Sequence, residues 1–150
     1  MPQSLSKMYA HIIFSTKHRI PIIDDEIEES LFRYLGSICQ AYECYPIQVG
    51  GYLDHVHILC RLSPKISQSE LLAEVKRQSS KWAKTQGEQY SRFYWQNGFT
   101  VFSVSPGKKD VVANYIKNQK QHHQRNSYRS EILAFLKKMK MKYNLKYLWD

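Results

Sequence analysis

The order of its hydrophobic patterns constrains the fold of this chain more than any other feature. Residues 8–16 alternate apolar and other side chains, which is typical of a strand, whereas Leu31 and Leu35 belong to a repeat of three or four residues, which is typical of a helix. Ser67 and Glu70 have the spacing of a capping box, so a second helix begins there. The predicted elements are a strand at 8–16, a helix at 24–42, a hairpin of strands at 46–51 and 55–62, a helix at 67–85 and a strand at 99–105.

The order strand, helix, hairpin, helix, strand indicates an α+β fold of the ferredoxin-like, split βαβ type. We expect an antiparallel sheet with helices on one face. A break at Ser105-Pro106-Gly107 precedes two extra C-terminal helices, predicted at about 109–124 and 130–142. The length of 150 residues and the absence of an internal repeat predict a single domain over residues 1–150.

The charge is distributed unevenly along the chain. The formal net charge is +9, and residues 105–150 carry +8 of it, with 11 Lys or Arg against three Asp or Glu. A basic C-terminal third favours a polyanionic partner such as nucleic acid, although a solvated basic surface has the same composition. The chain has no apolar run of membrane-spanning length and no signal-peptide pattern, so we expect a cytoplasmic protein without a membrane partner. Three cysteines without CxxC spacing indicate neither a disulfide framework nor a zinc knuckle.

The segment His55-Val56-His57 lies in the second strand of the predicted hairpin. Residues two apart on a strand point to the same face, so both imidazoles leave the sheet together, while Val56 and Ile58 face the opposite side. Asp54 precedes the pair and could orient one imidazole. Such a pair could hold a metal ion, although paired strand histidines are more often surface groups or hydrogen-bonded to neighbours.

A second group of polar residues lies on the helix predicted at 109–124. Tyr115 and Gln119 are four residues apart, so the phenol and the amide share one helix face. Taken alone, Tyr115 fits better as part of the buried stripe of Val111, Val112 and Ile116 than as a functional residue.

Together these segments resemble a known family. Leu53-Asp54-His55-Val56-His57-Ile58-Leu59, Trp95-Gln96-Asn97-Gly98-Phe99 and the residues from Tyr115 to His123 are similar to the signatures of the small single-tyrosine HUH transposases, the TnpA-type enzymes of insertion sequences. The resemblance covers residues 7–148. It implies a single HUH-type catalytic domain with a ferredoxin-like fold, acting as a homodimer with shared active sites. It also implies cleavage and rejoining of single-stranded DNA at hairpin-bearing element ends through a covalent 5′-phosphotyrosine.

The resemblance also implies roles for individual residues. Tyr115 would be the nucleophile, and His55, His57 and Gln119 would bind Mg²⁺ or Mn²⁺. These three ligands are neutral, so the charge of the cation would remain available to the scissile phosphate. Exchange of one phosphate ester for another retains the bond energy, and the sequence lacks a GxxxxGK[ST] phosphate loop, so we expect no nucleotide cofactor.

Basic residues near the tyrosine are candidates for DNA contacts. The candidates for backbone contacts are Lys117, Lys120, Arg125 and Arg129. His122 and His123 could contact phosphate or the metal. Two alternatives stay open. One is a host-adopted relative that processes genomic repeat hairpins. The other is a non-catalytic single-stranded nucleic-acid-binding module, which is considered because residues 98–102 partly match an RNP1 strand.

Overall fold

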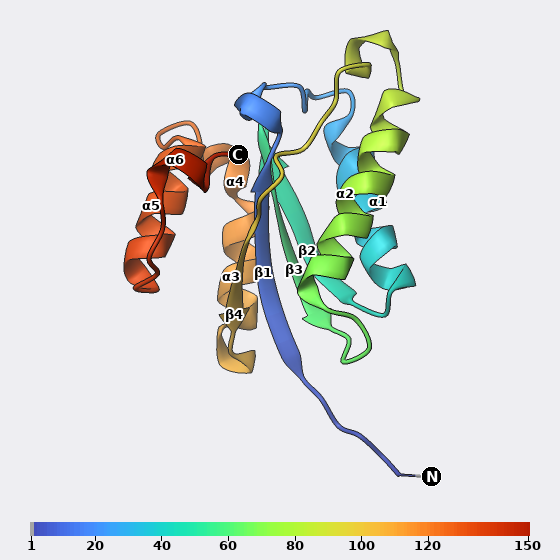
Figure 1. The fold of residues 1–150 in the computed structure, drawn as a ribbon, viewed down its shortest axis with the longest axis vertical. Coiled ribbons are helices and arrows are strands. Elements are labelled where there is room, and N and C mark those ends of the chain that lie inside the picture. The colour runs from blue at the N-terminus through green and yellow to red at the C-terminus, as the bar shows by residue number, and fades with distance from the viewer. Residues whose placement is uncertain (1) are drawn as a thin grey trace.

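The computed structural model describes residues 2–150 and contains the predicted order of strands and helices (Figure 1). The strands are β1 (Met8–Ser15), β2 (Tyr45–Tyr52), β3 (His55–Leu62) and β4 (Thr100–Val104). The helices are α1 (Glu28–Ala41), α2 (Gln68–Lys84), α3 (Lys109–Lys117), α4 (Gln119–His122), α5 (Tyr128–Lys138) and α6 (Leu145–Leu148). Short 3₁₀ turns occupy Lys17–Arg19, Glu88–Tyr90 and Pro106–Lys108.

The four strands form one antiparallel sheet in the order β2-β3-β1-β4. This order confirms the ferredoxin-like prediction, because the two outer strands of the chain, β1 and β4, lie side by side while the hairpin extends the sheet beyond β1. In the register of β1 and β3, Ile13 lies opposite His57 and His11 lies opposite Leu59. The central strand β1 therefore runs directly beside the histidine strand.

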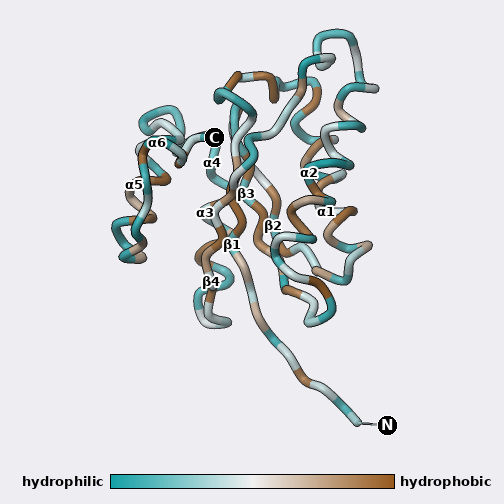
Figure 2. The backbone as a smooth tube through the Cα atoms, in the orientation of Figure 1, coloured by the Kyte–Doolittle hydropathy of each residue, from teal (hydrophilic) through white to brown (hydrophobic). Residues whose placement is uncertain are grey.

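The helices α1 and α2 cover one face of the sheet, as predicted. Ile12, Phe14 and Ile58 point from the strands into this layer, where they meet Leu31 and Leu71 of the two helices. All five side chains are at most 1% exposed. Figure 2 shows the hydrophobic stretches concentrated along the strands and the adjacent helix turns. Burial of this apolar surface is the main source of stability for the fold.

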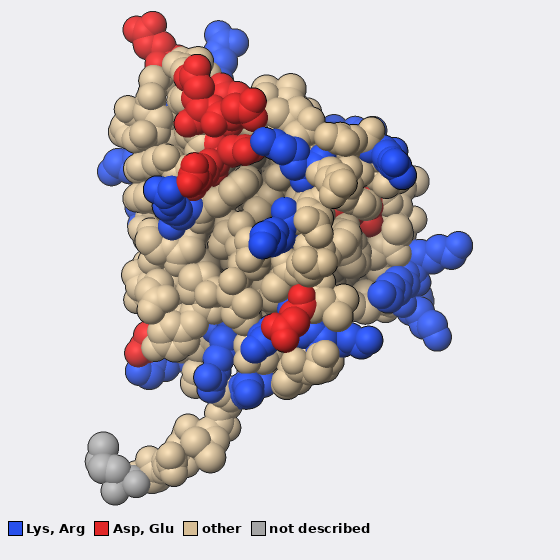
Figure 3. Space-filling model, turned by 180° about the vertical axis from the view of Figure 1, so that it is seen from behind, with Lys and Arg blue, Asp and Glu red and all other residues tan. Residues whose placement is uncertain are grey.

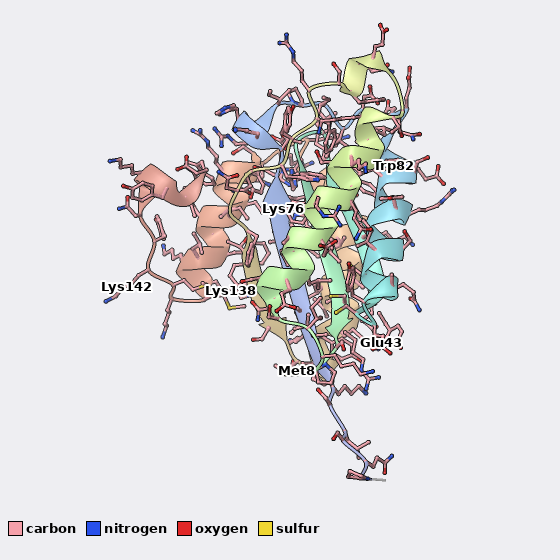
Figure 4. All side chains as sticks on the ribbon, turned by 45° about the vertical axis from the view of Figure 1, so that its right-hand side comes forward. Met8, Glu43, Lys76, Trp82, Lys138 and Lys142 are labelled. Atoms are coloured by element: carbon pink, nitrogen blue, oxygen red, sulfur yellow. The ribbon has the colours of Figure 1, made fainter. Side chains whose placement is uncertain are left out.

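The extra C-terminal helices pack on the opposite face of the sheet, which is the histidine face. There, Ile116 of α3 contacts Leu59 and Val104 in one apolar cluster. A second cluster joins Ile13 and Phe102 of the sheet to Tyr128, Ile132 and Leu136 of α5. Figure 4 shows the two layers apart, with α2 labelled at Lys76 and Trp82 and the C-terminal segment labelled at Lys138 and Lys142. The residues of the predicted site therefore lie between the sheet and the C-terminal helices.

The C-terminal third differs in detail from the prediction. The single helix expected at 109–124 is divided at Asn118, whose φ of −97° and ψ of 18° are not helical. The basic helix expected at 130–142 spans Tyr128–Lys138, because the Ser127 side chain accepts a hydrogen bond from the Ser130 amide and caps an earlier start. The short helix α6 was not predicted.

Gly50 brings α3 close to the sheet. It lies inside β2, as the strand predicted at 46–51 implies, and Leu53-Asp54 form the hairpin turn, with Leu53 at a φ of 51°. A Cβ atom on Gly50 would lie 2.7 Å from the carbonyl oxygen of Ile116. The absence of a side chain at Gly50 thus allows the backbone of α3 to rest on β2.

Two further features bear on the protein class. Cys39, Cys44 and Cys60 are free thiols buried in the core, which agrees with the absence of a predicted disulfide framework. Within residues 2–150, no helix combines the length and the apolar character needed to cross a membrane.

Candidate active site

The two histidines of the HUH segment lie on one face of β3 and are fully buried. His55 and His57 are both 0% exposed, under the layer formed by α3 to α5. Val56 and Ile58 point into the opposite layer with α1 and α2. The predicted division of β3 into an apolar face and a histidine face is confirmed.

Each histidine of the pair is oriented by a neighbour. Asp54 Oδ1 lies 2.8 Å from His55 Nδ1, which confirms the expected contact. His11 Nε2 lies 2.7 Å from His57 Nδ1, a contact that sequence reasoning missed. Burial lowers the pKa of His57 to about 4 and the pKa of His11 to about 3, with the charge of His57 lowering the latter further. Both rings are therefore neutral near pH 7, and the Nε2 atoms of His55 and His57 point away from β3.

Tyr115 and Gln119 reach the same place despite the break at Asn118. The ring centroid of Tyr115 lies 5.8 Å from that of His57. Gln119 is 1% exposed, and its Oε1 atom lies 2.9 Å from His55 Nε2. The predicted association of these four side chains is thus present in the fold, within one chain.

Glu131 of α5 lies at the centre of this cluster and was not predicted. Its side chain is 1% exposed. Oε1 lies 3.0 Å from His57 Nε2 and 3.5 Å from His55 Nε2. Oε2 accepts hydrogen bonds from the Tyr115 hydroxyl and, at 2.9 Å, from Gln119 Nε2. The carboxylate therefore contacts the predicted nucleophile and all three predicted metal ligands.

The surroundings shift the ionisation of Glu131 and Tyr115 in opposite senses. Burial alone would raise the pKa of Glu131, but hydrogen bonds from His123 and His57 lower that pKa well below its usual range. Burial and the neighbouring Glu131 charge raise the pKa of Tyr115. The resting site therefore contains a carboxylate beside a protonated phenol.

His122 and His123 line the edge of the cluster. His123 Nε2 lies 3.3 Å from Glu131 Oε1, and its ring centroid lies 4.3 Å from that of His55. His122 Nε2 lies 3.4 Å from the Tyr115 hydroxyl and 3.3 Å from Glu131 Oε2. Both histidines, whose roles the sequence left open, are thus within reach of the site.

The donor set suits a divalent cation. His55, His57, His123 and Glu131 each offer one ligand atom, and these atoms all lie within 4.8 Å of one another. The amide oxygen of Gln119 faces the same space. Imidazole nitrogens combined with carboxylate and amide oxygens fit manganese, and magnesium favours the oxygen ligands. The residues present therefore fit the metal that the resemblance implies.

The segment Trp95-Gln96-Asn97-Gly98-Phe99 is hydrogen-bonded to the end of β1 and to the start of α5, next to the site. Gln96 Oε1 accepts hydrogen bonds from the Ser15 amide at 2.8 Å and from the Tyr128 hydroxyl at 3.2 Å. The ring centroid of Tyr128 lies 4.9 Å from that of His55. Lys76 donates to the carbonyl oxygens of residues 96–98, which holds this turn on α2. The motif thus fixes the start of α5 against the histidine strand.

The basic candidates are dispersed around the site. Lys120 is paired with Asp25 and Glu28 of the α1 region, at 3.4 Å and 2.9 Å. Arg129 stacks over the ring of Trp149 at 5.3 Å. Lys117 and Arg125 are exposed, and Arg125 lines an open cavity of about 650 Å³ that also includes Tyr115. Figure 3 shows one group of acidic side chains towards the top of the rear face, with Lys and Arg scattered over that face and several of them along its lower part.

Comparisons with known proteins find similar transposases. Residues 4–119 match the family model described as "Transposase IS200 like". The chain is 26% identical over 115 residues to the transposase of insertion sequence element IS200 from Salmonella typhimurium and, equally, to that from Salmonella typhi; the match covers 73% of this chain and 74% of each relative.

Two solved structures share the fold. A putative transposase from Deinococcus radiodurans has a TM-score of 0.62 at 21% identity and covers 80% of this chain and 96% of its own. A REP-associated tyrosine transposase bound to a REP hairpin has a TM-score of 0.59 at 12% identity and covers 82% and 73%. Since the family model matches residues 4–119, most of the chain, this protein belongs to the IS200-like transposases, a family of the single-tyrosine HUH type.

Proposed function

We propose that this transposase binds, cleaves and rejoins single-stranded DNA through a covalent 5′-phosphotyrosine formed on Tyr115. The observation that carries the proposal is the packing of the Tyr115 ring against His57, 5.8 Å between centroids, inside a cluster that also contains His55 and Gln119. A phenol can act as a nucleophile, and two imidazoles with an amide oxygen can hold a cation that activates a phosphodiester.

His55, His57 and Gln119 would hold Mg²⁺ or Mn²⁺, and Glu131 and His123 supply further donor atoms at the same place. When bound, the cation would neutralise negative charge on the scissile phosphate. Asp54 and His11 keep the two metal-facing Nε2 atoms in position by binding the Nδ1 atoms of His55 and His57.

Tyr115 would attack the phosphorus and release a 3′-hydroxyl from the cleaved strand. The new phosphotyrosine ester replaces the old phosphodiester, so bond energy is conserved. An incoming 3′-hydroxyl can then reverse the reaction and join a new strand without a nucleotide cofactor. Lys117, Arg125 and Arg129 would hold the DNA backbone, and Lys120 would do so after leaving its acidic partners.

The substrate class follows from the family and its relatives. We infer that the DNA ends carry hairpins and that the active unit is a homodimer with shared active sites. A second candidate is a host-adopted enzyme acting on genomic repeat hairpins. The fold similarity to a REP-associated tyrosine transposase bound to a REP hairpin favours it.

The test is to incubate the protein and Mn²⁺ with labelled single strands from the genomic flanks of its gene. We expect a protein–DNA adduct with the wild type and none with Tyr115→Phe, which should still bind the strand. Tyr143→Phe, at a half-exposed tyrosine outside the cluster, is the matched control. Adduct formation by Tyr115→Phe would overturn the proposal.

A further inference from the structure

We propose that the open cavity beside Tyr115 binds one unpaired nucleotide of the DNA strand, next to the cleaved phosphate, and that amide side chains in this cavity read its base. The inference rests on the proposed function, because it names a part of the substrate that the same site would bind. The side chains that carry it belong to α3, α4 and the turn after α4, and none of them is a proposed metal ligand.

The first support is the position and size of this cavity. Tyr115 forms part of its wall, so a nucleotide bound there lies beside the proposed nucleophile. The volume of about 650 Å³ falls within the range of about 300–1,000 Å³ that is typical of sites for small ligands. The cavity is open to the surface, so one nucleotide can enter it while the rest of the strand stays outside.

The second support is the chemistry of the lining. Five exposed carboxamide side chains line the cavity and no acidic side chain does; the five belong to Asn114, Asn118, Gln121, Gln124 and Asn126. A carboxamide places a donor beside an acceptor, which is the pattern that pairs with the edge of a base. Within residues 2–150 none of the five forms a hydrogen bond through its side chain, and the contact from His123 to Asn126 is to the backbone oxygen. These side chains are therefore available to a ligand.

The third support is the spacing of the lining residues along the chain. An amide stripe runs along one side of α3 and α4 at intervals of three and four residues, formed by Val111, Asn114, Asn118, Gln121 and Arg125. Although the helix is divided at Asn118, the cavity contains all five residues, so the stripe continues across the division. The stripe and Tyr115 lie on the same segment. Their relation therefore does not depend on which subunit supplies the histidines.

The two ends of the stripe add further contacts that a nucleotide needs. Val111 is 63% exposed, so its side chain and the ring of Tyr115 give the cavity apolar surface against which a base can stack. Arg125 at the other end supplies a guanidinium group for a neighbouring phosphate. The cavity thus combines stacking surface, donors and acceptors for a base edge, and a cation for the backbone, as sites for unpaired nucleotides do.

A second copy of the chain is the other class of occupant for this surface. Contacts between subunit helices are built on apolar side chains that project and interlock. Among the residues that line the cavity, Val111 alone is aliphatic, and the surface is hollow at this place. A nucleotide therefore fits the cavity better than a partner helix does.

The experiment uses labelled single strands from the genomic flanks of the gene, with the cleaved phosphate first mapped from the wild-type adduct. Each of the two nucleotides beside that phosphate is then replaced in turn by the four bases and by an abasic residue. In the wild type we expect one base at one of these positions to form adduct about 5 to 150 times faster than the others, the range for one paired contact to a base edge. The abasic residue should be as slow as the least favoured base.

The variant is Asn114→Ala with Gln121→Ala, two exposed positions at which alanine favours the helix. It should form adduct at similar rates with all four bases and with the abasic strand, whereas a general distortion of the site would slow all strands and keep their order. The matched control is Gln40→Ala with Gln86→Ala, at two exposed glutamines in α1 and just after α2, and it should keep the wild-type preference.

Two further measurements do not depend on the double variant. Gln121→Glu has nearly the same shape but replaces a donor with an acceptor, so it should change which base is preferred. The wild-type preference should also appear in equilibrium binding of the same strands to Tyr115→Phe, measured by fluorescence anisotropy, because reading a base does not require cleavage.

The outcomes separate this inference from the proposed function. Equal wild-type rates for all bases at both positions, or an unchanged preference in Asn114→Ala with Gln121→Ala, overturn the role of the cavity and leave the function intact. A smaller mass in solution for that variant than for the wild type also overturns it, because contact between copies would then explain the amide stripe. Absence of adduct from the wild type with every strand overturns the proposed function itself.

Discussion

His11 supports His57 in the same way that Asp54 supports His55. A metal ligand that uses Nε2 must carry its proton on Nδ1, and that proton needs an acceptor. For His57 the group in place is His11 Nε2, 2.7 Å away, and burial lowers the pKa of His11 to about 3, so its ring is neutral. The neutral ring can accept the Nδ1 proton of His57.

We therefore expect His11→Asn to weaken Mn²⁺ binding by about tenfold or more, because the shorter side chain does not reach His57 Nδ1. Titration calorimetry or electron paramagnetic resonance would measure the affinity. The control is His18→Asn, at an exposed histidine with a φ of 58°, a conformation that asparagine tolerates. Equal affinities in the two variants would contradict a supporting role for His11.

At this scale, motif reasoning found the histidine pair, Tyr115 and Gln119, and missed His11 and Glu131. Signals for both existed. The alternation of residues 8–16 already placed His11 and Ile12 on different faces of β1. The face with His11 is the face of the sheet on which His57 of β3 lies. Glu131 is one of three acidic residues in a basic segment and stands next to Ile132 in an apolar stripe. Neither signal identifies a partner, because the partner depends on how α5 docks.

Among the elements, α3 depends most directly on one backbone contact. Gly50 of β2 lies under the carbonyl of Ile116, the residue that follows Tyr115. We expect Gly50→Ala to push α3 off the sheet, because the new Cβ would lie 2.7 Å from that oxygen. Overpacking of this kind lowers the free energy of unfolding by about 1–3 kcal/mol.

The same variant should slow adduct formation more than tenfold, since small displacements of a reacting group cost about that much or more. Chemical denaturation and adduct assays at a temperature where the variant is folded would separate the two effects. Gly107→Ala is the control, because no heavy atom lies within 4 Å of a Cβ at that position. An unchanged adduct rate in Gly50→Ala would show that the close contact between α3 and Gly50 does not position Tyr115.

The strands, and the two helices that cover them, were predictable from local sequence patterns. Strands alternate with a period of two residues, and helices repeat every three or four residues. The break at Asn118 was not predictable, since residues 109–124 read as one amphipathic segment and asparagine is tolerated within helices. After the division, Gln119 lies beside His55, with its Oε1 atom 2.9 Å from His55 Nε2. The extent of α5 depends on the Ser127 cap and on packing against Phe102, and the latter is a long-range contact.

For the whole molecule, the excess charge predicts a salt-dependent affinity for DNA. Removal of Lys117 and Arg125 by glutamine substitution should weaken binding to all single strands to a similar degree. The slope of log affinity against log salt should fall by about 0.7 for each lost phosphate contact. The matched control is Lys81→Gln with Arg92→Gln, two exposed residues on the side of α2. A changed sequence preference with an unchanged slope would contradict backbone contacts.

The inferred dimer predicts complementation between two inactive chains. In the single chain, Tyr115 lies against its own histidines, and Pro106–Lys108 form the turn from which α3 could cross to a partner. With crossed helices, a mixture of His57→Ala and Tyr115→Phe chains contains one intact site per mixed dimer. We expect adduct to return on the His57→Ala chain, detected by gel after subunit exchange. Mixed dimers confirmed by mass but lacking adduct would contradict shared sites.

The complete burial of His55 and His57 also limits how fast a metal ion can bind to them. With both rings 0% exposed beneath the C-terminal layer, a cation reaches their nitrogens only during moments when that layer moves aside. In stopped-flow mixing with Mn²⁺, the observed loading rate should therefore level off as the ion concentration rises, at the frequency of that opening. A rate that climbs in proportion to concentration throughout would mean that the path is permanently open. The limiting rate of metal uptake would therefore measure how often α5 moves away from the sheet.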